Sequence, residues 1–316
     1  MNPPNLLTDI VREKTSQPVY PAIQALVTHL RQQYHGAAAV LFYGSCLRSG
    51  QDRGGMADLY VLVDSYRHSG QSTLWSALNA LLPPNVFYLE VPFENRTVRA
   101  KYALLSLNDF EQGTSMRWFH SYIWGRFAQP IAIAYVRSPA DQDRIVMALA
   151  QAVTTFMHRA LPCTKTPFAA RDLWFKGLSL SYRSELRAEN PDKLSNLVEM
   201  FEEYYEKITR AAIDRMPYEV AIAEDGPRCR YTPQVSAHSR FSARQIWRVR
   251  FFQGKILSIL RLLKGAFTFA GGVDYIRWKI ERHTGVQAEV PRRLQRFPII
   301  ALGVLAWRIY RQGGFR

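Results

Sequence analysis

The sequence predicts a mixed α+β fold that begins with a sheet and flanking helices and continues into a mostly α second domain and a basic helical C-terminal segment. Strand-like apolar runs lie in the first third of the chain, where a Gly-Ser turn and a Pro-Pro pair separate them. Helical spacing of apolar residues prevails from residue 108 onward. The first 225 residues hold 23 Lys and Arg against 23 Asp and Glu, whereas the last 91 hold 18 against 3. We therefore predict domains at residues 1–107, 108–225 and 226–316.

The composition is that of an ordinary folded protein. The chain has 316 residues, of which 47% are hydrophobic and 21% charged, and this length allows two domains with cores. Its three cysteines are widely spaced and lack metal-type spacing, so nothing requires an oxidising compartment. Residues 1–17 contain acidic side chains and no apolar run, which argues against a secretory signal or a mitochondrial presequence.

The elements of the first domain follow from local pattern. Residues 21–34 have helical apolar spacing, residues 40–45 read as a strand that enters a Gly-Ser turn, and residues 56–64 read as a second strand. A short helix over 74–82 ends at Pro83 and Pro84. Strands over 86–91 and 97–105 follow, joined by a loop.

The rest of the chain is predicted to be mainly helical. Residues 108–215 have a helical polar-apolar pattern with prolines as punctuation. Residues 216–238 contain three prolines and are predicted to be rich in loops. Residues 244–264 interleave basic and apolar side chains at amphipathic helical spacing.

The Gly-Ser turn and the strand after it indicate phosphate chemistry. Gly44 lets backbone N–H groups approach a triphosphate closely, and the Ser45 hydroxyl adds a further contact. Asp58 is a carboxylate on a core strand, where a charge without a cation is costly, so it is a candidate Mg²⁺ ligand. The alternative is a structural turn with a strand-end aspartate.

A second carboxylate is missing at the expected spacing. Two acids at i and i+2 would point the same way, but the position two before Asp58 is Met56. Asp64 is on the same face but lies roughly 20 Å further along an extended strand, so it is expected to end the strand or cap the next element. Glu90 on the third strand or Glu185 from the second domain is left to complete the metal site. An exposed edge glutamate is the alternative for Glu90.

Four blocks in order resemble the mitochondrial-type phosphatidate cytidylyltransferases, the peripheral CDP-diacylglycerol synthases of the translocator-maintenance family within the polymerase-β nucleotidyltransferase superfamily. The blocks are Phe42-Tyr43-Gly44-Ser45 with Met56-Ala57-Asp58, then Lys101-Tyr102, then Tyr122-Ile123-Trp124-Gly125-Arg126 with Pro130, and then Ser181-Tyr182, Glu185, Arg187 and Lys193. A methionine two residues before the aspartate is itself a trait of that family. The chain departs from the family pattern at Ala103 for glycine, Glu185 for aspartate and Gln129 for a basic residue.

The resemblance implies a polymerase-β-type sheet, with a winged-helix arrangement as one alternative for the second domain. It also implies transfer of CMP from CTP to phosphatidic acid, which yields CDP-diacylglycerol and pyrophosphate with Mg²⁺. Asp58 and Lys101 become the candidate catalytic residues, and Asp58, Glu90 and Glu185 the candidate metal ligands. The candidate nucleotide contacts are Gly44, Ser45, Arg126, Tyr182, Arg187 and Lys193. For the basic members of this group, a solvated helix face or a structural salt bridge is the alternative.

The basic C-terminal region predicts an anionic partner. Its apolar run over residues 298–307 is only ten residues long, whereas a bilayer-spanning helix needs about 20. Basic residues flank this run, as in an interfacial anchor, and a core helix is the alternative. The prediction is a peripheral protein on a cytoplasmic or mitochondrial-matrix membrane face.

Two functions from different classes follow. The first is a phosphatidate cytidylyltransferase at an anionic membrane surface. The alternative is a nucleic-acid-binding protein that uses the basic tail on a degenerate nucleotidyltransferase scaffold. Because aromatic-basic RNA motifs are absent from the sequence and an apolar run is present, the lipid enzyme is favoured and nucleic acid is not the expected partner.

Overall fold

The computed structural model describes residues 6–49, 56–68, 77, 79, 81–185, 191–225 and 228–268. Its described strands form a five-stranded mixed sheet in the order β3-β4-β2-β1-β5, in which β2 and β4 are parallel and the other neighbours antiparallel. The strands are β1 Ala37–Tyr43, β2 Ala57–Val63, β3 Asn85–Phe93, β4 Arg96–Ser106 and β5 Ala132–Val136. The predicted mixed α+β fold is confirmed.

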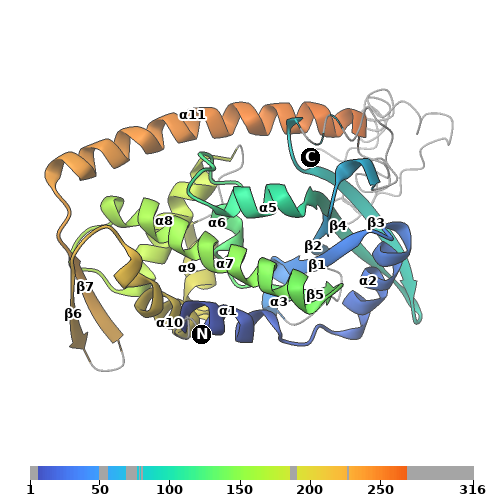
Figure 1. Cartoon of the computed structure of the whole chain (residues 1–316), viewed down its shortest axis with the longest axis horizontal. Coiled ribbons are helices and arrows are strands. Elements are labelled where there is room, and N and C mark those ends of the chain that lie inside the picture. Colours follow the sequence, from blue (N-terminus) through green and yellow to red (C-terminus); the bar gives the residue numbers. More distant parts are fainter. Residues whose placement is uncertain are drawn as a thin grey trace, which may run out of the picture.

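Helices surround the sheet and make up most of the rest of the described chain (Figure 1). Near the sheet are α1 Leu6–Thr15, α2 Pro21–Gln33, α3 Ser45–Ser49, α5 Leu107–Thr114 and α6 Trp124–Phe127. The second part consists of α7 Pro139–Ala160, α8 Ala170–Arg183, α9 Pro191–Met200 and α10 Glu202–Ala212. A hairpin of β6 Val220–Asp225 and β7 Arg228–Pro233 follows, and then α11 Ala237–Thr268.

The two faces of the sheet belong to two apolar clusters. Phe42, Leu59 and Tyr102 share one face and pack in a cluster with the apolar side of α2. Leu41, Tyr60 and Ala103 share the opposite face and pack in a cluster with α5, α7 and the other helices. Side chains two residues apart on a strand point to the same face. Asp58 therefore faces the helical part of the molecule together with Tyr60.

Two segments differ from expectation, and two others fall outside the described residues. The region 216–238, predicted to be rich in loops, contains the β6–β7 hairpin, and residues 132–136 form edge strand β5 within the predicted helical region. The hairpin is held by backbone bonds that join Phe168 and Tyr231 in both directions, and Tyr231 is buried. This tertiary pairing has no signal in local periodicity. Most of the predicted helix over 74–82 and the whole run 298–307 lie outside the described residues.

Helix α11 runs along one side of the molecule, from the β6–β7 hairpin to the sheet near β3 (Figure 1). Trp247 is 2% exposed and Arg250 is 3% exposed, so one side of the helix belongs to the core. The Trp247 indole donates to the Arg159 carbonyl oxygen over 3.0 Å. Part of the basic C-terminal region is therefore integral to the fold.

His120 gives this core a pH dependence. Burial, together with the nearby cations of Arg261, Arg159 and Arg250, lowers the pKa of His120 to about 3. An unfolded histidine titrates near pH 6.5, so the folded state binds fewer protons between these values and loses stability as the pH falls through that window. Between about pH 7 and about pH 5, the loss from this residue is about 2 kcal/mol.

Urea unfolding at both pH values, compared with a His120→Gln variant that cannot titrate, measures this contribution. The wild type is expected to lose about 2 kcal/mol more than the variant on acidification. An equal loss in both proteins would show that His120 does not carry the effect.

Candidate functional site

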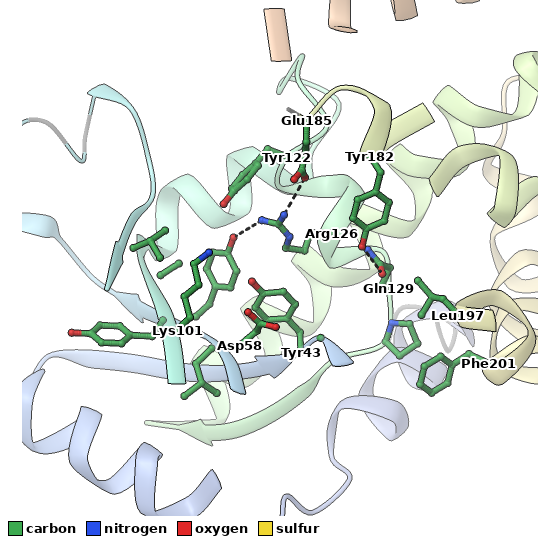
Figure 2. A pocket seen from close by; sticks show the side chains of 17 residues that line it. Tyr43, Asp58, Lys101, Tyr122, Arg126, Gln129, Tyr182, Glu185, Leu197 and Phe201 are labelled. Atoms are coloured by element: carbon green, nitrogen blue, oxygen red, sulfur yellow. Dashed lines mark hydrogen bonds and ion pairs between the residues drawn. The ribbon is translucent and has the colours of Figure 1, made fainter. Parts of the chain in front are cut away.

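A cavity of about 270 Å³ lies between the sheet and the helical part. Figure 2 shows its lining, which the sheet provides on one side and the helices provide on the other. The sheet side includes Tyr43, Gly44, Asp58, Tyr60 and Lys101, and the helical side includes Tyr122, Arg126, Gln129, Tyr182, Glu185, Leu197 and Phe201. Six of the sequence-predicted site residues therefore meet in one cavity: Gly44, Asp58, Lys101, Arg126, Tyr182 and Glu185.

Strand register brings Asp58 between two other lining residues. Asp58 is directly opposite Tyr43 on β1 and directly opposite Lys101 on β4. Gly44 follows Tyr43 with a φ of +88°, a conformation that L side chains rarely adopt. A Cβ added at Gly44 would lie 2.5 Å from Asp58 Oδ2. Glycine is thus required here both by its backbone conformation and by the closeness of the carboxylate.

Lys101 supplies a cation to the same wall. Its side chain is partly buried, and within the described residues no ion pair or hydrogen bond holds its ammonium group. A partly buried cation in the wall of a cavity is suited to an anionic ligand. Lys101 and Asp58 together place one positive and one negative group at neighbouring positions of the sheet.

Arg126 connects the sheet side of the cavity to the helical side. Its Nη1 donates to the Tyr60 hydroxyl over 3.1 Å, and its Nη2 donates to Glu185 Oε1 over 3.0 Å (Figure 2). The guanidinium lies 4.2 Å from the centre of the Tyr122 ring. Burial raises the pKa of Tyr60, so its phenol stays neutral. The guanidinium of Arg126 is therefore held by the neutral Tyr60 hydroxyl on the sheet side and by the Glu185 carboxylate on the helical side.

Close backbone approach makes the pair of Arg126 and Glu185 possible. A Cβ at Gly125 would lie 2.1 Å from Ser181 Oγ, so only glycine lets α6 approach the end of α8 this closely. The Ser121 hydroxyl also shares a hydrogen bond of 2.7 Å with that of Ser184, next to Glu185. The segment before α6 and the last turn of α8 are thereby fastened together.

Three predicted residues do not line the cavity, and a fourth is not described by the structure. Glu90 accepts from Arg99 Nε over 2.9 Å and from the Tyr88 hydroxyl over 2.6 Å, outside the cavity. Ser45 is exposed at the start of α3, and Lys193 is exposed on α9, one turn before Leu197. Arg187 lies outside the described residues.

The cavity has few carboxylates, and they suit a metal ion that takes most of its ligands from a bound substrate. No group of three or more His, Cys, Asp or Glu side chains that could hold an ion occurs in the described part of the chain. Asp58 beside Gly44 is one carboxylate, and Glu185 is paired with Arg126. Mg²⁺ commonly binds through one or two carboxylates and completes its shell with substrate phosphates and water. This donor set fits that mode of binding.

Sequence reasoning missed several aromatic residues of the cavity. Tyr60 accepts a hydrogen bond from Arg126, and Tyr122 packs on its guanidinium. Tyr60 lies two residues after Asp58 on the same strand, so the period of two could have placed it on the same face. Phe201 and Leu197 are brought in by α9 and the segment after it, for which the sequence has no comparable signal.

One comparison with known proteins gives a match. A family model described as "Phosphatidate cytidylyltransferase, mitochondrial" matches residues 61–245, which is more than half of the chain. The matched segment includes Lys101, Arg126 and Glu185 and begins three residues after Asp58. A search of curated proteins finds no match.

Proposed function

The chain belongs to the mitochondrial phosphatidate cytidylyltransferase family, and from that premise we infer how its cavity makes CDP-diacylglycerol. The enzyme is a nucleotidyltransferase of phospholipid biosynthesis. In the reaction, an oxygen of the phosphatidate phosphate attacks the α-phosphorus of CTP. The bond from that phosphorus to the bridging oxygen breaks, and pyrophosphate leaves. A phosphate monoester is already nucleophilic near neutral pH, so a general base is not obligatory.

The sheet side of the cavity is proposed to hold the triphosphate. Gly44 lets the backbone approach the phosphates, and the Ser45 hydroxyl at the start of α3 is a further proposed contact. Asp58 would hold Mg²⁺, which, when bound, neutralises charge on the reacting phosphates. The ammonium of Lys101 stabilises the charge that develops on the pyrophosphate leaving group. The support is that Gly44, Asp58 and Lys101 line one cavity.

The helical side is proposed to position the substrates. Arg126 presents a planar guanidinium to the cavity, and such a group can bind phosphate oxygens in a bidentate manner. Glu185 orients it through their ion pair, and Tyr182 is placed beside Gln129, whose Oε1 accepts from the Tyr182 hydroxyl over 3.4 Å. Glu185 is proposed to position Arg126 and not to contact the substrate, because its carboxylate already accepts a hydrogen bond from Arg126.

The observation that carries this proposal is the meeting of Asp58, Lys101 and Arg126 in one cavity. The test is incubation of the purified chain with Mg²⁺, phosphatidic acid and CTP labelled at its α-phosphate. Label is expected in the lipid phase as CDP-diacylglycerol, and chelation of the metal is expected to stop its appearance. Absence of labelled lipid under all metal and vesicle conditions would contradict the proposed function.

The outward side of α11 is proposed to dock on an anionic membrane. It exposes large apolar side chains, namely Phe241, Val249, Phe252, Ile256 and Ile259. The exposed basic residues Arg244, Arg248 and Lys255 lie beside them at helical spacing. An apolar face with a basic flank is typical of a helix that lies in a membrane interface. Among the described residues, no helix meets the length and hydropathy needed to cross a bilayer.

A charge on this surface should weaken membrane association. Phe252 is 71% exposed, so Phe252→Glu should leave the fold intact while opposing insertion of the apolar face. We expect about a tenfold loss in affinity for vesicles that contain phosphatidic acid, measured by flotation. The matched control is Met147→Glu on α7, where an exposed apolar residue also becomes acidic. Equal flotation of both variants would exclude α11 as the docking surface.

The nucleic-acid alternative has no comparable support. The family that matches acts on a lipid, and the basic side chains of the cavity lie beside carboxylates. The outward side of α11 is apolar at its centre, whereas a phosphate-backbone surface is typically polar and basic. Binding of RNA by the protein in the buffer of the flotation assay would support this alternative.

A further inference from the structure

Tyr122, a residue of the cavity wall, receives two guanidinium groups. Arg126 lies 4.2 Å from the centre of its ring, and Arg261 of α11 lies at the same distance. Two like charges at one aromatic ring repel each other. An arrangement of this kind is stabilised when an anion lies between or beside the two cations.

Only one of these two cations has a carboxylate partner in the described part of the chain. Arg126 is paired with Glu185 at 3.0 Å, whereas Arg261 forms no ion pair with a carboxylate of the described residues and feels Glu185 only at longer range. The Nε of Arg261 donates to the Pro83 carbonyl oxygen over 3.0 Å, and its guanidinium packs on Tyr122. Burial lowers the pKa of Arg261, which shows that the charge is held away from water at a cost. The charge of Arg261 therefore remains available for an anion.

The position of Arg261 is fixed by the packing of α11. Gly254 lies where a Cβ would be 2.4 Å from the Ser184 carbonyl oxygen, so the helix rests directly on the end of α8. One turn past Arg261, Lys264 donates to the carbonyl oxygens of Leu82 and Pro84, the latter over 3.2 Å. These contacts anchor the helix on both sides of Arg261 and keep its guanidinium at Tyr122.

We propose that Arg261 is a further substrate-binding residue, which together with Arg126 holds the phosphate of the lipid acceptor at Tyr122. This inference rests on the proposed function, because that function supplies the phosphate monoester. The lipid is favoured over CTP because Arg261 is carried by α11, whose outward side is the proposed membrane surface, whereas Asp58 and Lys101 lie across the cavity on the sheet.

The test is steady-state kinetics of the full chain with CTP and dihexanoyl phosphatidate, a soluble acceptor that makes membrane docking unnecessary. Arg261→Gln should raise the KM for the acceptor by about 10- to 100-fold, the range for loss of one charged hydrogen bond, and leave the KM for CTP within about twofold. Arg261→Lys keeps the charge and should lose less than Arg261→Gln. The matched control is Arg31→Gln, since Arg31 is an exposed guanidinium 4.1 Å from the Tyr135 ring and does not line the cavity. The control should behave as the wild type.

Three results would overturn the inference. The first is an acceptor KM in Arg261→Gln that equals that of Arg31→Gln. The second is a rise in the KM for CTP in place of that for the acceptor, which would assign Arg261 to the nucleotide. The third is an equal loss in Arg261→Lys and Arg261→Gln, which would assign a role of shape and not of charge. Any of these in an active wild-type enzyme leaves the proposed function standing, whereas an inactive wild type would refute that function first.

Discussion

Asp58→Asn is expected to reduce CMP transfer by at least about a thousandfold, because it removes the carboxylate of the cavity that is proposed to hold a metal beside the triphosphate. The substitution keeps the size of the side chain, and the position is not part of the apolar core. The fold should therefore survive. Incorporation of labelled CMP into lipid measures the loss, and the far-ultraviolet circular dichroism spectrum checks the fold.

Asp64→Asn is the matched control for this experiment. Asp64 lies just past the end of β2 and pairs with Arg137 at 2.6 Å, at a largely exposed position outside the cavity. An exposed ion pair contributes roughly 0–1 kcal/mol, so this variant should retain its activity. A fully active Asp58→Asn enzyme would remove Asp58 from the catalytic site.

Trp247→Ala is expected to lower the free energy of unfolding by about 3–5 kcal/mol, the usual cost of deleting a large buried aromatic side chain. Trp247 is 2% exposed, with its ring centre 5.9 Å from that of Trp124 and 5.8 Å from that of Phe251. The variant also loses the hydrogen bond to the Arg159 carbonyl oxygen. The midpoint of urea denaturation measures the change.

Ile246→Ala provides the comparison at the adjacent position. Ile246 is 45% exposed, and a surface substitution of this kind usually changes stability by about 0.5 kcal/mol or less. Similar midpoints for the two variants would mean that α11 does not belong to the core. A large difference would show that the helix has one structural side and one side left for a partner.

The sequence by itself determined the sheet side of the site. The apolar runs predicted strands that carry Asp58 and Lys101, and the Gly-Ser turn predicted a glycine that allows close approach; the structure brings all three residues to one cavity. These features are local, since strand period and the need for positive φ can be read from neighbouring residues. The mixed α+β class and the helical form of 244–264 could be predicted for the same reason.

Only the tertiary structure decided which distant residues complete the site. Glu90 and Glu185 were both candidate ligands in the sequence, with an exposed edge glutamate as the alternative for Glu90. Arg99 engages Glu90 outside the cavity, whereas the approach of α6 to α8 brings Glu185 to Arg126. The amphipathic pattern of α11 likewise did not reveal which of its sides is buried. Periodicity reports that a helix has two unlike sides, but the partner of each side depends on the packing of elements far apart in the chain. In α11, that packing buries Trp247 and brings Arg261 to Tyr122.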